Sequence, residues 1–376
     1  MREQPAAAPT RCLRSEKSRA GTGCGTYRRP VRSEGIGDVA TAGTSTWTDS
    51  AWRSAALAWA GAELDRAGLT LDREPAQPHV YPWSTVFRLP VRGGAVWLKS
   101  VGPGSAHEPA LSAALGGWVP DRVLVPLAVD PARRLMLLPD GGRTLRDVGG
   151  TTLVEAWESL LRAYARLQLE LVPRAGAMLG LGVPDHRPER LPELVADLLD
   201  DDDAQVTGRD GGLAPEVRKR VVADLGQYAE LCHLLIDGGV PATLQHDDLH
   251  DANVFVSGNR HRFFDWGDAS VSHPFLSLLV PLRVARQSLS VPDGHPVLLR
   301  LRDSYLHEWR DHGSPEHLRD QCAVALRVGP LQRALTWHRI LRGVHPAERT
   351  EWADSVPGWT AEHLVPGTLT PARVLG

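Results

Sequence analysis

The sequence predicts an α+β fold of two lobes, with a small strand-rich lobe over residues 47–139 and a larger, mostly helical lobe over residues 140–376. Short apolar runs that end at glycine-rich turns occupy much of residues 84–101 and 122–142, which is typical of strands. After Gly150, apolar residues recur at intervals of three and four, which indicates amphipathic helices. Hydrophobic residues make up 42% of the 376-residue chain, enough for a sizeable buried core.

The first lobe begins with a helix that Asp49 is placed to cap and that runs to about Leu69. The stretch STVFRLPVRGGAVWLKSV then predicts two strands joined by a turn at Arg92-Gly93-Gly94. Two more strands are expected in RVLVPLAVD and RRLMLLPDGG, with a helix between the pairs in AHEPALSAALGGWV. The glycine-rich end of the last strand, residues 138–142, is expected to form a hinge between the lobes.

The second lobe is expected to contain long helices in VEAWESLLRAYARLQLEL and PEVRKRVVADLGQYAELCHLLID, because both stretches repeat apolar residues with helical spacing. Between them and the C-terminus, NVFVSGNRHRFFDW predicts a hairpin with its turn at Ser257-Gly258-Asn259. Further helices are expected to about residue 363.

Residues 1–46 are rich in Gly, Ala, Arg, Ser and Thr and show no apolar periodicity, so we expect an unstructured tail there. They contain no apolar core of the kind that a secretory signal needs. We therefore expect a chain that begins near Ser45 to fold as stably as the whole chain.

Composition excludes several classes of protein. The net charge of −3 gives no overall attraction to nucleic acid or to an acidic membrane surface. No apolar run approaches the ~20 residues that a membrane-spanning helix requires. The four cysteines lie far apart without a CxxC pair, which predicts neither a disulfide framework nor a cysteine zinc site. A reducing cytoplasm is the expected location.

The stretch LQHDDLHDANVFV carries the chemistry. It places Asp248 and Asn253 five residues apart, and Asp265 follows in FFDWGD at the far end of the expected hairpin. Phosphoryl transfer from a nucleotide uses such a set, since one carboxylate orients the attacking hydroxyl while an amide oxygen and a second carboxylate hold Mg²⁺ against the phosphates. With His246 at its head, the spacing D-L-x-x-x-N matches the catalytic loop of kinases.

A lysine is also needed to contact the phosphates. Only three of the 42 basic residues are lysines, namely Lys17, Lys99 and Lys219. Lys99 stands out because it lies inside an apolar strand, and Glu108 follows it on an expected helix at the distance found in kinases.

These stretches together resemble a known family. QHDDLHDANVFV…FFDWGDAS closely resembles the H-G-D-L-H-x-x-N…D-W signature of the aminoglycoside phosphotransferase family, which comprises kinase-like phosphotransferases of small molecules. RRLMLLPDGGRTLR resembles the hinge of that family, and PWSTVFRLP…VWLKS…HEPALSAAL resembles its first strands, lysine and paired helix. The resemblance covers about residues 80–280 and implies a protein-kinase-like fold and a transferase that uses ATP and Mg²⁺.

The resemblance implies a role for each matching residue. Asp248 is the catalytic base or the carboxylate that orients the acceptor hydroxyl. Asn253 and Asp265 bind Mg²⁺. Lys99 contacts the α and β phosphates and pairs with Glu108.

The family also implies how the nucleotide is held. Residues 137–140, including Leu137, Leu138 and Asp140, would line the adenine pocket with backbone groups, and Ser84 and Thr85 would lie in the loop over the phosphates. Because a hinge of this kind contacts purines through its backbone, GTP is a possible donor beside ATP.

The sequence departs from the family pattern at two positions. Asp247 replaces the glycine of H-G-D, which adds a negative charge beside Asp248, and Ser277 stands where the family often has an aspartate. The expected acceptor is a small hydroxylated molecule, and the acceptors of the family include aminoglycosides, choline, sugars and amino-acid-like alcohols.

Two other functions fit parts of the pattern. His246, Asp248 and His250 with their acidic neighbours are also compatible with a metal-dependent hydrolase, although that function leaves Lys99 and Asp265 without roles. A nucleotide-binding scaffold without transfer activity is the second alternative. Metal-dependent nucleotide turnover separates these classes, because a hydrolase does not need ATP and a scaffold binds it without using it.

Overall fold

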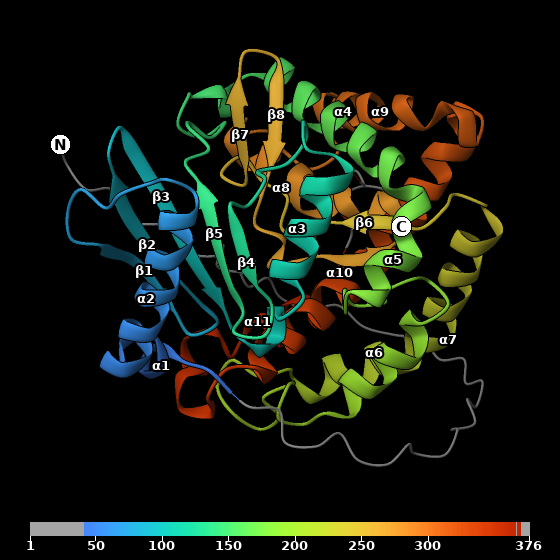
Figure 1. The fold of residues 1–376 in the computed structure, drawn as a ribbon. Helices are drawn as coiled ribbons and strands as arrows, with labels where there is room; N and C mark the ends of the chain where they lie inside the picture. The colour runs from blue at the N-terminus through green and yellow to red at the C-terminus, as the bar shows by residue number, and fades with distance from the viewer. Residues whose placement is uncertain (1–40, 366, 370–376) are drawn as a thin grey trace. The chain divides into compact units, whose positions relative to one another are not determined.

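A five-stranded antiparallel sheet forms the first lobe of the computed structural model, which describes residues 41–365 and 367–369 (Figure 1). The strand order is β1-β2-β3-β5-β4. The strands are β1 (Ala76–Tyr81), β2 (Ser84–Val91), β3 (Gly94–Val101), β4 (Ala128–Asp130) and β5 (Leu135–Pro139). The two strands that flank the 92–94 turn are confirmed. Strand β1 was not anticipated, and the strand expected in RVLVPLAVD is confined to its last three residues.

Helix α2 (Ser50–Arg66) packs against the sheet through one small-residue stripe. The Asp49 carboxylate accepts the Trp52 N–H at 2.7 Å, which confirms the expected N-cap. Ala60 and Leu64 of the helix share an apolar cluster with Phe87 and Leu98 of the sheet. Burial of these side chains therefore fixes β2 and β3 and, with them, the position of the lysine on β3.

Helix α3 (Glu108–Trp118) is the expected helix between the strand pairs. Pro109 occupies its first turn, where a missing N–H costs nothing. Leu111 and Leu115 point into the main core and are fully buried. As a result Glu108, at the start of the helix, is held beneath the sheet.

The second lobe is mostly helical (Figure 1). Its largest fully buried side chains include Trp157, Tyr164, Phe275, Tyr305 and Trp309, which form one core. The helices are α4 (Val154–Leu171), α5 (Ala175–Gly180), α6 (Leu191–Asp200), α7 (Pro215–Asp237), α8 (Leu279–Ser288), α9 (Pro296–Leu306), α10 (Pro315–Arg342) and α11 (Ser355–Glu362).

Two short strand pairs flank the catalytic loop. β6 (Thr243–Gln245) pairs with β9 (Ser270–Ser272), and β7 (Val254–Ser257) pairs with β8 (Arg260–Phe263). The second pair is the hairpin expected from the sequence, and Gly258 in its turn has φ +58°, which glycine adopts easily. The loop therefore begins and ends at hydrogen-bonded strands.

Helix α10 connects the two lobes. Its Arg339 donates to the carbonyl of Gly104, next to α3, and at 3.2 Å to the carbonyl of Gly267 in the second lobe. Trp337, two residues earlier, packs edge-on against Trp83 in the turn between β1 and β2, with ring centroids 5.8 Å apart. One element thus contacts both walls of the site.

The structure differs from the expected tail at its last residues. Residues 1–40 of that tail lie outside the described residues, but residues 41–46 are folded. Ala42 exchanges backbone hydrogen bonds with Gly343 and His345, and the Thr44 hydroxyl donates to Glu348 at 2.6 Å. Helix α1 (Thr44–Thr48) follows. A chain that begins at Ser45 therefore loses contacts to the C-terminal segment, contrary to our expectation.

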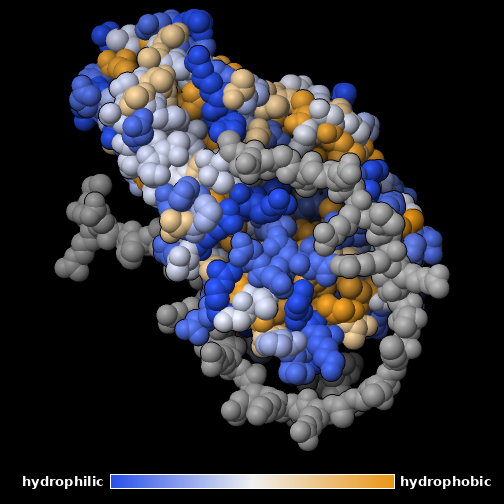
Figure 2. Space-filling view, turned by 90° about the horizontal axis from the view of Figure 1, so that it is seen from below, coloured by the Kyte–Doolittle hydropathy of each residue, from blue (hydrophilic) through white to orange (hydrophobic). Residues whose placement is uncertain are grey.

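Within the described ranges, no helix combines the length and the apolar character needed to cross a membrane. On the face seen from below, hydrophilic residues gather near the middle (Figure 2).

We predict that Trp47→Ala lowers the free energy of unfolding by roughly 3–5 kcal/mol, the usual range for truncating a buried aromatic side chain. Trp47 is 2% exposed, and its indole N–H donates to the Tyr81 carbonyl at 2.8 Å. Denaturant unfolding of the full chain measures the loss. Trp47→Phe keeps most of the packing and should lose far less, and equal stability of all three chains would contradict the structural role of this segment.

Candidate active site

Asp248 lies in the loop between β6 and β7, and its side chain is about a third exposed, at 36%. His250 pairs with one of its carboxylate oxygens at 3.4 Å, and the Asn253 amide donates to its backbone carbonyl at 3.0 Å. Burial raises the pKa of Asp248, but the hydrogen bond from His250 and the charge of Arg333 outweigh it and hold the pKa well below its usual value. The carboxylate is therefore ionised and fixed at neutral pH.

The neighbouring Asp247 has a left-handed backbone, with φ +65°. Glycine adopts this conformation without strain, which explains why the family pattern has glycine here. In this chain the Asp247 side chain is 4% exposed and accepts hydrogen bonds from Gln245, Gln332 and Thr336. The added charge thus turns away from solvent and binds the loop to α10.

Lys99, Glu108 and Asp265 meet as the sequence predicted. The Lys99 ammonium lies 2.7 Å from Glu108 Oε1 and 2.6 Å from Asp265 Oδ1. Burial lowers the pKa of Lys99, but the charges of Asp265 and Glu108 outweigh it and raise the pKa, so the lysine stays protonated. The Trp266 N–H donates to the same Glu108 oxygen at 3.2 Å, which joins α3 to the segment after β8.

Asn253 and Asp265 offer the oxygen atoms that Mg²⁺ prefers. The Asn253 side-chain N–H groups donate to the backbone carbonyl of Asp248 at 3.0 Å and to its carboxylate at 3.4 Å, and the described residues donate nothing to the Asn253 amide oxygen. Asp265 uses one oxygen on Lys99, and its side chain is 46% exposed. One carboxylate oxygen and one amide oxygen are therefore available, and the donor set fits a hard divalent cation.

The hinge residues lie at and after the end of β5. The Leu137 carbonyl accepts the Leu127 N–H at 2.7 Å, so this group belongs to the sheet, and the Leu137 side chain is fully buried. Leu138 is partly exposed, and Asp140 is exposed and accepts the Gly142 N–H at 2.9 Å. The accessible part of the expected adenine-binding segment is thus residues 138–140.

Ser84 and Thr85 lie in a strand, whereas we expected them in a loop, and their place over the phosphates stays a prediction. They form the first two residues of β2, and the turn before it is Pro82-Trp83. The Thr85 hydroxyl is buried, donates to the His79 carbonyl at 2.8 Å and accepts from Gln77 at 2.9 Å. The Thr85 hydroxyl therefore already donates one hydrogen bond and accepts another within the sheet.

The histidines of the loop are engaged in shaping it. His246 Nε2 lies 2.8 Å from the Phe264 carbonyl, directly before Asp265, and its ring packs against Trp266 at 4.8 Å. Among the residues that the structure describes, no three His, Cys, Asp or Glu side chains form a group that could hold a metal ion. This geometry gives the hydrolase alternative no support.

Sequence reasoning missed four contact residues of the site. Arg146 forms two hydrogen bonds to Asp251 at 2.8 and 3.0 Å, which ties the hinge segment to the loop. Arg333 and Arg339 lie on α10, and Asp268 lies in the segment after β8. No sequence signal marked these arginines, because arginine supplies all but three of the 42 basic residues.

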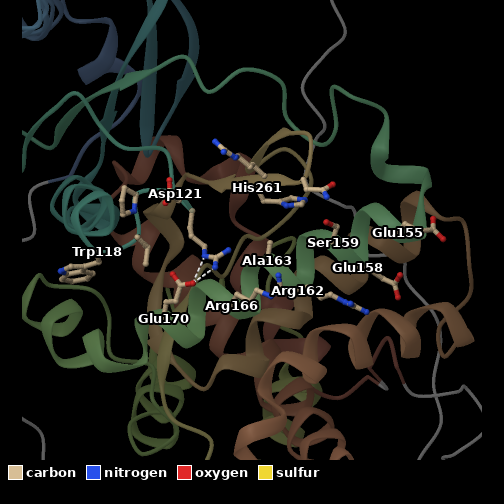
Figure 3. Close-up of a pocket in the computed structure, with 15 residues that line it drawn as sticks. Trp118, Asp121, Glu155, Glu158, Ser159, Arg162, Ala163, Arg166, Glu170 and His261 are labelled. Carbon is tan, nitrogen blue, oxygen red and sulfur yellow. Dashed lines mark hydrogen bonds and ion pairs between the residues drawn. The ribbon is translucent and has the colours of Figure 1, made fainter.

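A separate cavity of about 890 Å³ lies near α4, the end of α3 and the β7–β8 turn (Figure 3). Arg122 forms an ion pair at 2.5 Å with Glu170, one of the lining residues labelled in Figure 3. None of the predicted site residues lines this cavity. It has no part in the chemistry described here.

We predict a pH-dependent contribution of His250 to stability. Burial lowers the pKa of His250, but hydrogen bonds to Asp248 and Asp251 outweigh it and raise the pKa from 6.5 to about 9. The protonated histidine therefore stabilises the folded chain fully below pH 6.5, and this stabilisation is lost as the pH rises through about 9. Relative to His250→Gln, wild type should gain on the order of 2–3 kcal/mol at low pH and little at high pH.

Urea unfolding at several pH values measures this difference. His233→Gln, on the exposed surface of α7, serves as the control and should match wild type throughout. A difference between wild type and His250→Gln that grows with pH would contradict the assignment.

Comparison with known proteins agrees with this geometry. The sequence matches the model of the phosphotransferase enzyme family (APH) over residues 109–318. No curated protein matches the sequence significantly. Among solved structures, a choline/ethanolamine kinase family protein from Mesorhizobium loti has a TM-score of 0.53 at 17% identity, with 84% of this chain and 96% of that chain covered.

Two further structures are similar. A choline kinase from Cryptosporidium parvum has a TM-score of 0.52 at 11% identity, covering 77% of this chain and 88% of that chain. A macrolide 2'-phosphotransferase type I has a TM-score of 0.50 at 16% identity, covering 82% and 96%. At such identities the likeness shows the fold, and it confirms the kinase-like two-lobed fold predicted from the sequence.

The family match covers more than half of the chain and includes the hinge, the catalytic loop and Asp265. It confirms the resemblance on which the sequence interpretation rested. The chain belongs to the phosphotransferase enzyme family and has a kinase-like fold.

Proposed function

We propose that the protein transfers the γ-phosphoryl group of ATP, in the presence of Mg²⁺, to a hydroxyl of a small molecule. The observation that carries this proposal is the convergence of Lys99, Asp265, Asn253 and Asp248, which come from β3, from the segment after β8 and from one loop. Phosphoryl transfer requires a protonated lysine, two oxygen donors suited to a metal ion, and an ionised carboxylate.

Lys99 binds the phosphates of the donor. Its ammonium is held between Glu108 and Asp265, so it is charged and oriented before the nucleotide arrives. Preorganisation of this kind reduces the ordering cost of binding. Residues 138–140 contact the purine through their backbone, which makes GTP a possible second donor.

Asn253 and Asp265 hold Mg²⁺. When bound there, the ion would supply positive charge against the phosphate oxygens. The chain contributes by fixing the ligands, since Asn253 is oriented through its amide N–H groups and Asp265 through Lys99.

Asp248 orients the acceptor hydroxyl. Its low pKa makes it a weak base, which suits a loose transition state in which the hydroxyl keeps its proton until late. The carboxylate accepts the hydroxyl hydrogen and aims the oxygen at the γ-phosphorus. The acceptor is a small hydroxylated molecule such as an aminoglycoside, a sugar or an amino alcohol. We place the reaction in the cytoplasm, where ATP is available.

Incubation of the purified chain with ATP and Mg²⁺ and a panel of aminoglycosides, choline-like alcohols, sugars and hydroxylated amino acids tests the proposal. Release of ADP that depends on both metal and acceptor, with a phosphorylated product seen by mass spectrometry, supports it. Tight nucleotide binding without turnover on any acceptor would favour the scaffold alternative. Turnover of an ester or amide without ATP would favour the hydrolase.

We predict that Asp248→Asn and Asp265→Asn fail in different ways. Asp248→Asn removes the hydroxyl acceptor, so transfer should fall by ~10²–10⁴ while Mg·ATP still binds. Asp265→Asn should weaken Mg·ATP binding itself, because a neutral amide does not balance the metal charge. Fluorescent-nucleotide titration and single-turnover transfer measure the two effects. Asp320→Asn, on the exposed surface of α10, is the control.

The loop also contains Asp247 and Asp251, either of which could be confused with Asp248. If Asp248→Asn transferred at the wild-type rate, the assignment of the transfer carboxylate would be wrong. If Asp265→Asn kept wild-type Mg·ATP affinity, the metal would have to be held elsewhere.

We predict that Lys99→Met raises KM for ATP and lowers kcat, because methionine keeps part of the apolar stem but carries no charge for the phosphates. The chain offers a matched control in Lys219→Met, since Lys219 is an exposed lysine on α7. Steady-state kinetics over a range of ATP concentrations measures both constants. Wild-type kinetics in Lys99→Met would separate Lys99 from the donor site.

A further inference from the structure

Arg333 brings a buried cation from α10 to the catalytic carboxylate. Its side chain is 5% exposed, and one terminal nitrogen lies 3.2 Å from Asp248 Oδ1. The other terminal nitrogen lies 2.5 Å from Asp268 and 3.7 Å from Asp247. The guanidinium also lies over the ring of Trp337, 5.6 Å from its centroid. Three carboxylates and an aromatic face thus surround one arginine.

The contact completes the fixation of Asp248. Oδ2 of this carboxylate is engaged by His250 and by the Asn253 amide, both at 3.4 Å, whereas Oδ1 is engaged by Arg333. Because both oxygens have partners on different sides, rotation of the carboxylate about its terminal bond breaks contacts on each side. Without Arg333, Oδ1 has no other hydrogen-bond donor among the described residues.

Asp268 and Asp247 hold the guanidinium itself. A buried arginine needs paired carboxylates, and its planar fork lets two terminal nitrogens reach two different ones. Asp268 follows Asp265 by three residues, and Asp247 precedes Asp248 directly. The acid that replaces the family glycine at position 247 therefore serves as a counter-ion for the cation on α10.

We propose that Arg333 is a positioning residue of the transfer site, which holds the Asp248 carboxylate toward the acceptor hydroxyl while Asp268 and Asp247 keep its guanidinium in place. This inference rests on the proposed function, since it assigns Arg333 an effect on transfer. It goes beyond the family motif, because Arg333 lies outside the matched residues 109–318.

The test separates positioning from a structural role. Arg333→Met, Arg333→Lys and Arg319→Met are compared in the full chain, with Mg·ATP as donor and water as acceptor, so that no acceptor needs to be known. Arg319 is the matched control, because it lies on the same helix, is 45% exposed and pairs with Asp303. The 14-residue separation places it ~21 Å along the helix from Arg333.

We expect Arg333→Met to lower kcat for ATP hydrolysis by ~10²-fold, the scale of a misplaced reacting group, with KM for ATP unchanged. Arg333→Lys should recover part of kcat, because it restores the charge but not the fork. Arg319→Met should keep wild-type kcat and KM. A wild-type kcat in Arg333→Met, or equal losses in Arg333→Met and Arg319→Met, would overturn the inference.

Loss of the arginine removes the cation that balances Asp268 and the buried Asp247, so the double variant Arg333→Met/Asp268→Asn is included as a chain with one of these acids neutralised. If Arg333→Met does not fold, a lowered kcat at wild-type KM in the double variant supports the inference, and a wild-type kcat there overturns it. A wild-type chain that turns over ATP neither with water nor with any acceptor of the panel overturns the proposed function as well. If wild type is active and the Arg333 variants keep its kcat and KM, only this inference is overturned.

Discussion

The contact of Lys99 with both Glu108 and Asp265 is the interaction on which the rest of the site depends. It joins β3, α3 and the segment after β8 through one buried ammonium, at 2.7 and 2.6 Å. A buried charge without partners is costly, so the elements are stable together only in this arrangement. The Trp266 N–H extends the contact to the backbone that carries Asp265. The same interaction that stabilises the fold therefore places Lys99 and Asp265, the residues that we propose bind the phosphates and the metal, next to each other.

Helix α10 makes a second set of contacts to the site. Arg333 balances the charge of the loop, Trp337 packs against Trp83 in the turn between β1 and β2, and Arg339 donates to Gly104 and Gly267. Each contact joins α10 to a different part of the site. Because a helix is rigid over this length, displacement of α10 would disturb the catalytic-loop carboxylates and the β1–β2 turn together.

Local patterns predicted the elements whose contacts are local. The cap of α2 at Asp49, the 92–94 turn and the hairpin at 257–259 follow from neighbouring residues, and all three are present. The sequence did not predict β1. Its residues, 76–81, do not alternate regularly between buried and exposed positions, and its pairing with β2 has an irregular register. Residues 41–46 were assigned to the tail because their partners, Gly343 to Glu348, lie some 300 residues away in the chain.

The sequence by itself determined the identity of Asp248, Asn253 and Asp265 as a set, because these residues lie on one loop and one hairpin, where spacing fixes their relative placement. It also identified Lys99, since a lysine in an apolar strand needs a buried partner. Only the tertiary structure decided that Thr85 is buried in the sheet, that Asp247 turns toward α10, and that Arg333, 85 residues after Asp248, reaches its carboxylate. Contacts of this kind depend on how helices pack across a core, and no local spacing encodes them.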